Sequence, residues 1–321
     1  PALQEGTFLL KNRTMTQWGR DFRCEAVLRE NGVEISRWEV KLPDLPPMSE
    51  QTMQVEIPEC RKLGREYHLE FSISRKTDTW YSKAGEEMGK RQFELAGGVL
   101  PTQILSSGKT VFLAETETEF KVSGESFTAV FSKETGGIIT LIKDGIHYLA
   151  GGLTPCLTRP ITGLDVQPGW GWYDIVSQLE GMVPKAARPV IFTAEGQIRL
   201  EFPWKMQSKA NVLAEGKTCY TVADGKVEIE YTIRLPESWP FVPRAGVELI
   251  LSPGLEHIRS YSRGPLENYC DRKLCAPIQV WESTVSEQHF PFSPPSETGG
   301  HEDARWLEIH DPNGGRLRIE A

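Results

Sequence analysis

Three carboxylates stand close to turn motifs in the C-terminal third of this 321-residue chain: Glu267, Asp271 and Glu297. Two of them belong to the stretch GPLENYCDR, residues 264–272, where Arg272 follows a Gly-Pro turn. A glycosidase needs two carboxyl groups beside the scissile bond, about 5 to 5.5 Å apart when configuration is retained. The same groups can instead accept hydrogen bonds from turn amides and from the arginine, and so hold a corner between strands. The residues alone leave both interpretations open.

A second group of candidates is aromatic. The stretch PGWGWYDI places Trp170, Trp172 and Tyr173 beside glycines, in a region without strand-like alternation. An exposed ring packs against the C–H face of a sugar while the sugar's hydroxyls reach nearby carboxylates and amides. Burial in a core is the alternative, because tryptophan is largely buried on average.

Other chemistries find less support in the sequence. The six histidines share no motif with metal-ligand spacing, so no metal site is expected, and no G-x-S-x-G elbow is present to anchor a Ser-His-Asp triad. Glycine patterns that bind dinucleotides or phosphates are also missing. The six cysteines contain no C-x-x-C pair, which favours reduced thiols over a disulfide framework; Cys270 and Cys275 are the pair to check.

The elements that must position these groups are strands. Apolar residues alternate with polar ones in REYHLEFSIS, residues 65–74, and again over residues 227–235. An Asn-Gly pair at 31–32 and an Asp-Gly pair at 224–225 each separate two such segments, which is a strong hairpin signal. Only SKAGEEMGKRQFEL, residues 82–95, allows a helical turn or two. The fold class is therefore predicted to be all-β.

The length exceeds that of one ordinary domain and predicts two. Residues 1–96 have the short strands and turns of an antiparallel sandwich. Residues 97–116 lose the alternation and gain Gly, Pro and Ser, which predicts a linker. Strand-like segments resume over residues 117–321 as a second domain.

Charge and hydropathy exclude several partners. A net charge of -8 and a pI near 5.5 argue against nucleic acid, which requires a basic surface. No apolar run approaches the roughly 18 residues of a membrane span, so no membrane partner is expected. The start PALQEGTFLL has no signal-peptide pattern, and the end GGRLRIEA reads as a strand interrupted in mid-course; we expect an excerpt from a longer polypeptide.

The stretch YSRGPLENYCDRK…RWLEI, residues 261–309, resembles the C-terminal β-sandwich domain of the large β-galactosidases of glycoside hydrolase family 2. The residues that carry this resemblance are Gly264, Pro265, Glu267, Asn268, Tyr269, Asp271 and Arg272, then Pro291, Pro294 and Glu297, then Arg305 and Trp306. Upstream, residues 79–95 resemble the end of the preceding immunoglobulin-like domain, and residues 118–141 the entry into the next one. The resemblance covers nearly the whole chain.

This resemblance implies an immunoglobulin-like β-sandwich followed by a larger, galactose-mutarotase-like β-supersandwich that is incomplete at its C-terminus. It also implies that the catalytic glutamates lie on a TIM barrel preceding the matched region, so no catalytic residue is expected in this chain. Any Mg or Na of the parent enzyme is expected on that barrel, and no cofactor here. The Gly264–Arg272 motif with Glu297 is then expected to be structural.

The segment TRPITGLDV, residues 158–166, resembles the family's segment beside the sugar pocket. Arg159 and Asp165 match it, whereas residues 162–164 depart from it. The candidates for lining a carbohydrate cleft are therefore Arg159, Asp165, Trp170 and Trp172.

The resemblance also implies partners: a β-galactoside bound through the parent enzyme, the catalytic barrel domain, and contacts in a homo-oligomer. The sequence assigns no localisation, and a cytoplasmic compartment is only favoured for the parent. The alternative is a stand-alone carbohydrate-binding module or the small subunit of a two-chain β-galactosidase.

Overall fold

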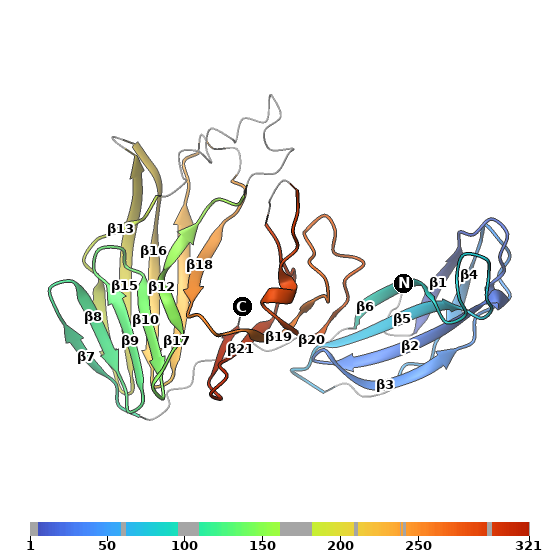
Figure 1. The fold of residues 1–321 in the computed structure, drawn as a ribbon, viewed down its shortest axis with the longest axis horizontal. Helices are drawn as coiled ribbons and strands as arrows, with labels where there is room; N and C mark the ends of the chain where they lie inside the picture. Colours follow the sequence, from blue (N-terminus) through green and yellow to red (C-terminus); the bar gives the residue numbers. More distant parts are fainter. Residues whose placement is uncertain are drawn as a thin grey trace.

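The structure, a computed structural model, describes residues 6–58, 62–95, 109–160, 182–208, 211–237, 239, 242–293 and 297–320. Over these residues the chain is all-β as predicted, with two short 3-10 helices, η2 (Gly19–Asp21) and η3 (Ser286–Gln288). None of the described helices is long and apolar enough to cross a bilayer. Figure 1 shows an N-terminal sandwich, a large sandwich, and a further sheet between them.

The N-terminal sandwich packs a two-stranded sheet against a four-stranded one. Its strands are β1 (Thr7–Asn12) with β4 (Ser49–Gln54), and β3 (Val33–Val40), β2 (Phe22–Glu30), β5 (Tyr67–Arg75) and β6 (Glu87–Leu95) in that spatial order. Tyr67, Leu69 and Phe71 alternate onto the buried face of β5, which confirms the periodicity of residues 65–74. Phe8 of β1 closes the core edge-on against Phe71, with ring centroids 4.8 Å apart.

Local turn chemistry explains the β2–β3 hairpin. Asn31 and Gly32 both have positive φ, 48° and 78°, as a two-residue hairpin turn requires. The helical alternative for residues 82–95 is wrong, because Phe93 packs on the core and Leu95 is buried with it when the segment pairs as β6 with β5. Burial of these side chains outweighs the helix propensity of the intervening charged residues.

Two five-stranded sheets form the large sandwich. One runs β11 (Ile146–His147), β10 (Ile138–Lys143), β9 (Phe127–Ser132), β8 (Glu119–Ser123) and β7 (Phe112–Glu115). The other contains β13 (Lys185–Ala186), β15 (Gln197–Ser208), β16 (Asn211–Ala223) and β17 (Lys226–Arg234), with β14 (Val190–Ala194) also pairing β15. The pair β12 (Leu149–Cys156) and β18 (Gly246–Leu251) adjoins them.

The core of the large sandwich is aromatic. Phe120 and Phe131 from one sheet meet Phe202 and Tyr220 from the other, and all four are fully buried. The Asp-Gly pair at 224–225 forms the predicted hairpin between β16 and β17. Strand β7 lies inside the stretch predicted as a linker, because residues 112–115 pair with β8; the domain boundary itself stays a prediction.

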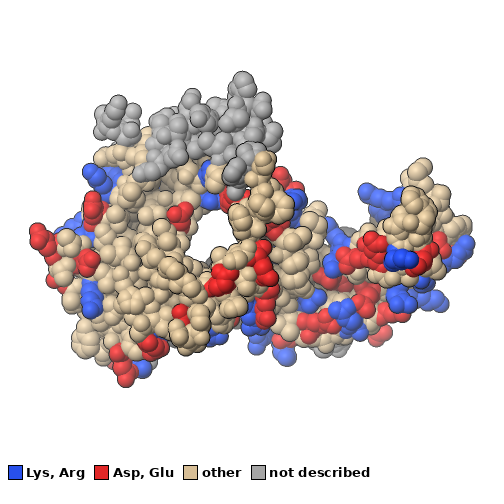
Figure 2. All heavy atoms as spheres, in the orientation of Figure 1, with Lys and Arg blue, Asp and Glu red and all other residues tan. Residues whose placement is uncertain are grey.

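The four-stranded sheet has the order β20 (Ile278–Thr284), β19 (His257–Arg263), β21 (Trp306–His310) and β22 (Arg316–Glu320). Its apolar face joins the large sandwich through a small core in which Ile309 is buried with Tyr148 and Leu255. An opening separates the rest of this sheet from the large sandwich, and charges of both signs are interspersed over the visible surface (Figure 2).

The contact between this sheet and the N-terminal sandwich, which we call the junction, is polar. Arg305 pairs with the carboxylate of Glu66, its Nε lying 3.1 and 3.0 Å from the two oxygens, and the Tyr261 hydroxyl donates to the same group at 2.5 Å. Gln92 exchanges two hydrogen bonds with the backbone of Ile278. Side chains far apart in sequence therefore fix one body on the other.

Candidate functional site

The residues of the turn motif come together around Glu267. One oxygen of this carboxylate accepts hydrogen bonds from the Gly299 amide at 3.2 Å and the Tyr269 hydroxyl at 3.4 Å. The other oxygen pairs with Arg272 at 3.4 Å, and the same guanidinium lies over the Tyr269 ring. The side chain of Glu267 is 15% exposed, so the carboxylate is largely enclosed by groups of the corner itself.

Asn268 fastens the same corner to the loop before β21. Only 1% of Asn268 is exposed. The backbone N–H of Asn268 donates to the Gly300 carbonyl at 2.8 Å, and its side-chain Oδ1 accepts from the Glu302 backbone amide at 2.8 Å. Its Nδ2 donates to the Leu266 carbonyl at 3.0 Å, and a cis peptide bond joins Gly264 to Pro265 just before. Every polar atom of the Asn268 side chain is thus used within the protein.

The Glu297 carboxylate has a different arginine partner from that of Glu267, although the Tyr269 hydroxyl contacts both residues. Arg244 pairs with the Glu297 carboxylate, while the Glu297 backbone carbonyl accepts from the Tyr269 hydroxyl at 3.2 Å. Of the three carboxylates that the sequence singles out, Glu267 and Glu297 are each paired with their own arginine, and Asp271 lies exposed at the surface. This arrangement suits a corner that holds strands; the structural role of the motif stays a prediction.

The carbohydrate-cleft candidates are only partly within the described residues. Arg159 is half-buried, and its Nη1 donates to the neighbouring Pro160 carbonyl at 3.4 Å. Asp165, Trp170 and Trp172 lie outside the described residues. The cleft assignment therefore stays a prediction for all four residues.

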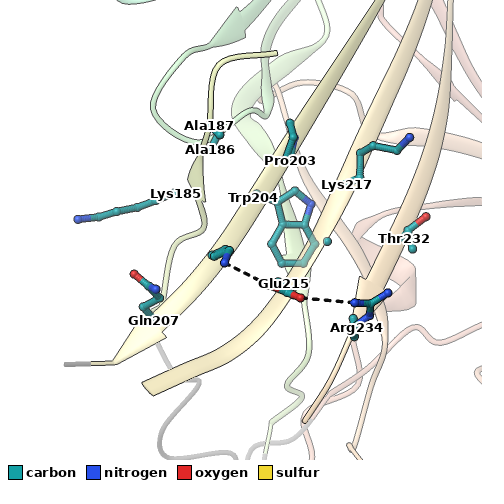
Figure 3. Close-up of a pocket in the computed structure, with 12 residues that line it drawn as sticks. Lys185, Ala186, Ala187, Pro203, Trp204, Gln207, Glu215, Lys217, Thr232 and Arg234 are labelled. Atoms are coloured by element: carbon teal, nitrogen blue, oxygen red, sulfur yellow. Dashed lines mark ion pairs between the residues drawn. The ribbon is translucent and has the colours of Figure 1, made fainter. Parts of the chain in front are cut away.

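A pocket that sequence reasoning missed lies on the outer face of β13, β15, β16 and β17, with a volume of about 490 Å³ (Figure 3). Its polar lining consists of Lys185, Lys205, Gln207, Glu215, Lys217, Thr232 and Arg234. Strand register explains the grouping, because Lys205 pairs with Glu215 and Glu215 with Arg234 across neighbouring strands. The ion pairs, drawn dashed in Figure 3, join the Glu215 carboxylate to Lys205 at 3.4 Å and to Arg234 at 3.8 Å.

This outer-face pocket is cationic and has the wrong chemistry for glycoside cleavage by paired carboxylates. Four of its lining side chains are cations and one is a carboxylate, in a chain whose net charge is -8. Trp204 belongs to the lining but is only 3% exposed, with its ring stacked on Tyr231 and its indole N–H bound to Thr218. A single ion-paired carboxylate cannot supply both the acid and the nucleophile.

The sequence held only part of the signal for this pocket. Alternation over residues 197–207 places Lys205 and Gln207 on the face opposite Phe202, which is visible without a structure. The pairing of Lys205 with Glu215 and then Arg234 depends on the register of two hairpins, which no local pattern provides.

Metal and thiol chemistry gain no support from the side chains that the structure places. Over the described ranges, no group of three or more His, Cys, Asp and Glu residues is arranged to hold a metal ion. The five described cysteines are free thiols, Cys270 and Cys275 among them. Burial raises the pKa of Cys24 to about 11, so this thiol is inert near neutral pH.

Fold and site together define an all-β region of consecutive sandwiches in which the prominent carboxylates serve ion pairs. The chain belongs to the family described as the beta galactosidase small chain, which matches residues 123–321. Residues 8–96 match beta-galactosidase, domain 4. Family membership, expected from the turn motif, is thereby confirmed.

Curated relatives agree with this family. A beta-galactosidase of Priestia megaterium is 26% identical over 318 residues, which cover 97% of this chain and 30% of the relative. Beta-galactosidase BgaC of Bifidobacterium adolescentis is 26% identical over 204 residues, covering 62% of this chain and 19% of the relative. A beta-galactosidase of Streptococcus thermophilus is 20% identical over 321 residues, 100% of this chain and 31% of the relative. The chain spans less than a third of the length of these relatives.

Proposed function

We propose that this chain is the non-catalytic C-terminal part of a retaining β-galactosidase that hydrolyses terminal β-D-galactosides. Its role is to support the catalytic barrel, to shape one wall of the carbohydrate cleft and to contribute to oligomer contacts. The observation that carries the proposal is the state of Glu267 and Glu297, each of which is paired with an arginine of the same chain.

Retaining hydrolysis needs one carboxylate free to attack the anomeric carbon and a carboxylic acid that gives its proton to the leaving group. The arginine partner of each glutamate occupies carboxylate oxygens that the nucleophile and the acid would direct at the substrate. Glu267 also accepts from the Gly299 amide and the Tyr269 hydroxyl, which leaves its oxygens directed at the corner. The chemistry is accordingly assigned to another part of the parent enzyme.

The test is hydrolysis of a chromogenic β-galactoside by the purified chain, alone and after mixing with a separately produced N-terminal portion of the Priestia megaterium relative. We expect no turnover by the chain alone and turnover in the mixture. Glu267→Gln and Glu297→Gln serve as controls, which should leave any background unchanged. Turnover by the chain alone that either substitution abolishes would refute the proposal.

A second candidate is the small subunit of a two-chain enzyme or a stand-alone carbohydrate-binding module. The family description, which names a small chain, favours the first of these. A binding module predicts measurable affinity of the isolated chain for a galactoside by calorimetry, and loss of that affinity in Trp170→Ala or Trp172→Ala. An accessory region that requires the barrel predicts no such affinity.

A further inference from the structure

The end of the N-terminal sandwich that points away from the four-stranded sheet carries exposed apolar side chains (Figure 1). Strand register fixes its place: β5 begins beside Glu66 at the junction and ends at Arg75, nine residues and about 30 Å further on. The β5–β6 hairpin loop, residues 76–86, starts there. We call this loop and its neighbours, residues 13–21 and 41–48, the distal end; its exposed apolar side chains are Met15, Met48, Trp80 and Tyr81.

Hydrogen bonds join the three loops of the distal end into one surface. The Met48 amide donates to the Thr14 carbonyl at 3.2 Å, and Arg20 Nη1 pairs with the Asp44 carboxylate at 2.7 Å. The ammonium group of Lys76 donates to the Arg20 carbonyl at 2.9 Å. The exposed apolar side chains therefore stand on one connected surface rather than on independent loops.

Trp80 is 95% exposed, which makes it the most exposed aromatic side chain of the described residues. Its loop is nevertheless ordered by its own hydrogen bonds: the Thr79 amide donates to the Ser82 carbonyl at 2.8 Å, and Asp78 Oδ1 accepts from the Ala84 amide at 2.9 Å. An ordered loop loses little conformational entropy when a partner covers it, while the indole gains burial of its apolar area. Trp80 therefore has the properties of an interface anchor.

Tyr81 is fixed next to this anchor. Its ring meets Trp80 edge-on, with centroids 5.0 Å apart, and its hydroxyl accepts from Arg75 Nη2 at 2.8 Å. The same guanidinium lies over the Tyr81 ring, 4.9 Å from the centroid. Tryptophan, tyrosine and arginine are the residue types that most often dominate the binding energy of protein interfaces. The side chains at the tip of the hairpin thus indicate a protein partner.

Met48 extends the apolar surface onto the neighbouring loop. Its side chain is exposed, and its φ of 54° lies in the left-handed region, which a bulky residue rarely adopts. Strained backbone of this kind concentrates at binding sites, where the surrounding structure holds it. Methionine side chains adapt their shape to a partner and make favourable contacts with aromatic rings. A methionine held at the surface in this way suits an interface with aromatic side chains.

The charges of the distal end suit a second copy of the same chain. Asp78 pairs with Lys83 at 2.8 Å, and the Arg20–Asp44 pair lies on the neighbouring loops. A two-fold interface brings a surface against itself, so a surface with one sign of charge would repel its copy. Exposed pairs of both signs avoid this repulsion.

The segments that lead out of this sandwich attach at its other end. Gly6 precedes β1 and lies at the opposite end of that strand from Asn12, whose side-chain amide donates to the Leu45 carbonyl of the distal end at 3.2 Å. Leu95, the last residue of β6, pairs with Tyr67 at the start of β5. Neither segment therefore occupies the distal end by its attachment, which favours a separate molecule as the occupant.

We propose that the distal end forms an interface with a second copy of this chain, in which Trp80 and Tyr81 of each copy pack against the distal end of the other about a two-fold axis. The exposed ion pairs form the polar rim of this interface. The inference deepens the proposed function, on which it rests, by naming the surface that makes the oligomer contacts. Self-association requires neither substrate nor barrel, so its test and the hydrolysis test can fail independently.

The first test is sedimentation of the 321-residue chain over roughly 1 to 100 μM, the range in which a dimer of micromolar affinity dissociates. The weight-average mass should rise from 36.1 kDa toward twice that value. Trp80→Ala should weaken dimerisation about tenfold or more, as expected for a central aromatic anchor.

Leu63→Ala is the matched control, because Leu63 is 96% exposed but precedes β5 at the junction end of the same sandwich. It should leave dimerisation unchanged. Both substituted side chains lie at the surface, so both variants should keep the urea unfolding midpoint of the unsubstituted chain. A 36.1 kDa species at every concentration, or equal association in Trp80→Ala and Leu63→Ala, overturns the proposal.

The second test locates the contact by hydrogen exchange at low and high protein concentration. Backbone amides of residues 13–21 and 76–86 should exchange more slowly at high concentration, and Trp80→Ala should abolish this slowing. The competing surface is β22 (Arg316–Glu320), the edge strand of the four-stranded sheet, whose free edge could pair with another chain. Slowing confined to β22 would assign the self-association to that edge and refute the distal interface.

Discussion

At the scale of single residues, His68 makes the junction sensitive to acid. Burial is the main cause that lowers its pKa to about 4, while Glu66 opposes the shift and Arg305, Arg263 and Arg29 add to it. The unfolded chain regains the ordinary value of about 6.5 and therefore binds one more proton between these limits. The contribution of His68 to the free energy of unfolding is therefore fully present above pH 6.5 and is lost as the pH falls toward 4.

Urea unfolding at a series of pH values measures this effect. We expect a loss of up to about 3 kcal/mol between pH 6.5 and 4 that is attributable to His68, at about 1.4 kcal/mol per pH unit. His68→Gln should flatten the profile over this range, whereas the exposed His310→Gln should retain it. An unchanged slope in His68→Gln would contradict the assignment.

Glu66 is the second residue whose surroundings make a prediction. Burial alone would raise its pKa, but hydrogen bonds from Arg305 and Tyr261 hold the pKa below its ordinary value. Glu66→Gln should lower the free energy of unfolding by about 3 kcal/mol, since it leaves a partly buried arginine without its carboxylate.

The control is Glu25→Gln, because Glu25 forms an exposed pair with Arg37. That substitution should cost less than about 1 kcal/mol. Equal losses in Glu66→Gln and Glu25→Gln, measured by chemical denaturation, would show that the junction pair is no stronger than a surface pair.

At the scale of elements, the β2–β3 hairpin turn does more than reverse the chain. A Cβ at Gly32 would lie 2.5 Å from the Tyr261 ring and 2.9 Å from the Val280 amide nitrogen. Position 32 thus requires glycine for two reasons: its φ is positive, and β19 and β20 approach it closely.

Gly32→Ala should therefore destabilise the chain by about 3 kcal/mol, combining strain at positive φ with a steric overlap at the junction. Gly225→Ala is the matched control: its φ is 80°, but the nearest atom to an added Cβ is the Lys143 Nζ at 3.5 Å. It should lose only about 1 kcal/mol. Equal losses of unfolding free energy in Gly32→Ala and Gly225→Ala, measured by thermal and urea unfolding, would show that no steric overlap arises at the junction.

The same elements show what sequence can predict. The hairpins at 31–32 and 224–225 follow from turn residues flanked by alternation, because both signals act within ten residues. The junction cannot be predicted in this way, since Glu66 and Arg305 are 239 residues apart and no local pattern pairs them. The outer-face pocket could not be predicted for a related reason, because its charged side chains come together only through the register of neighbouring strands.

At the scale of the whole molecule, the two sandwiches have separate cores. Among the residues that the structure describes, the core of the N-terminal sandwich shares none with that of the large sandwich. The polar junction around Glu66 and Gln92 helps to join the N-terminal sandwich to the four-stranded sheet. Independent cores with a polar contact predict bodies whose unfolding can be shifted separately.

Differential scanning calorimetry tests this organisation. Glu66→Gln should lower the midpoint of the transition that contains the N-terminal sandwich by roughly 12 to 24 °C, since a loss of about 3 kcal/mol corresponds to about 4 to 8 °C per kcal/mol for a domain of this size. The transition of the large sandwich should keep its midpoint, because no junction residue enters its core. A common downward shift of all transitions would indicate one cooperative unit instead.

The polar character of the junction also bears on how the chain is made. Glu66 precedes Arg305 by 239 residues, so at about 5 to 20 residues per second the N-terminal sandwich waits roughly 10 to 50 seconds on the ribosome for the sheet it will meet. A hydrophobic face exposed for that interval would invite aggregation. A face of Glu66, Lys90 and Gln92 remains hydrated until its partner emerges.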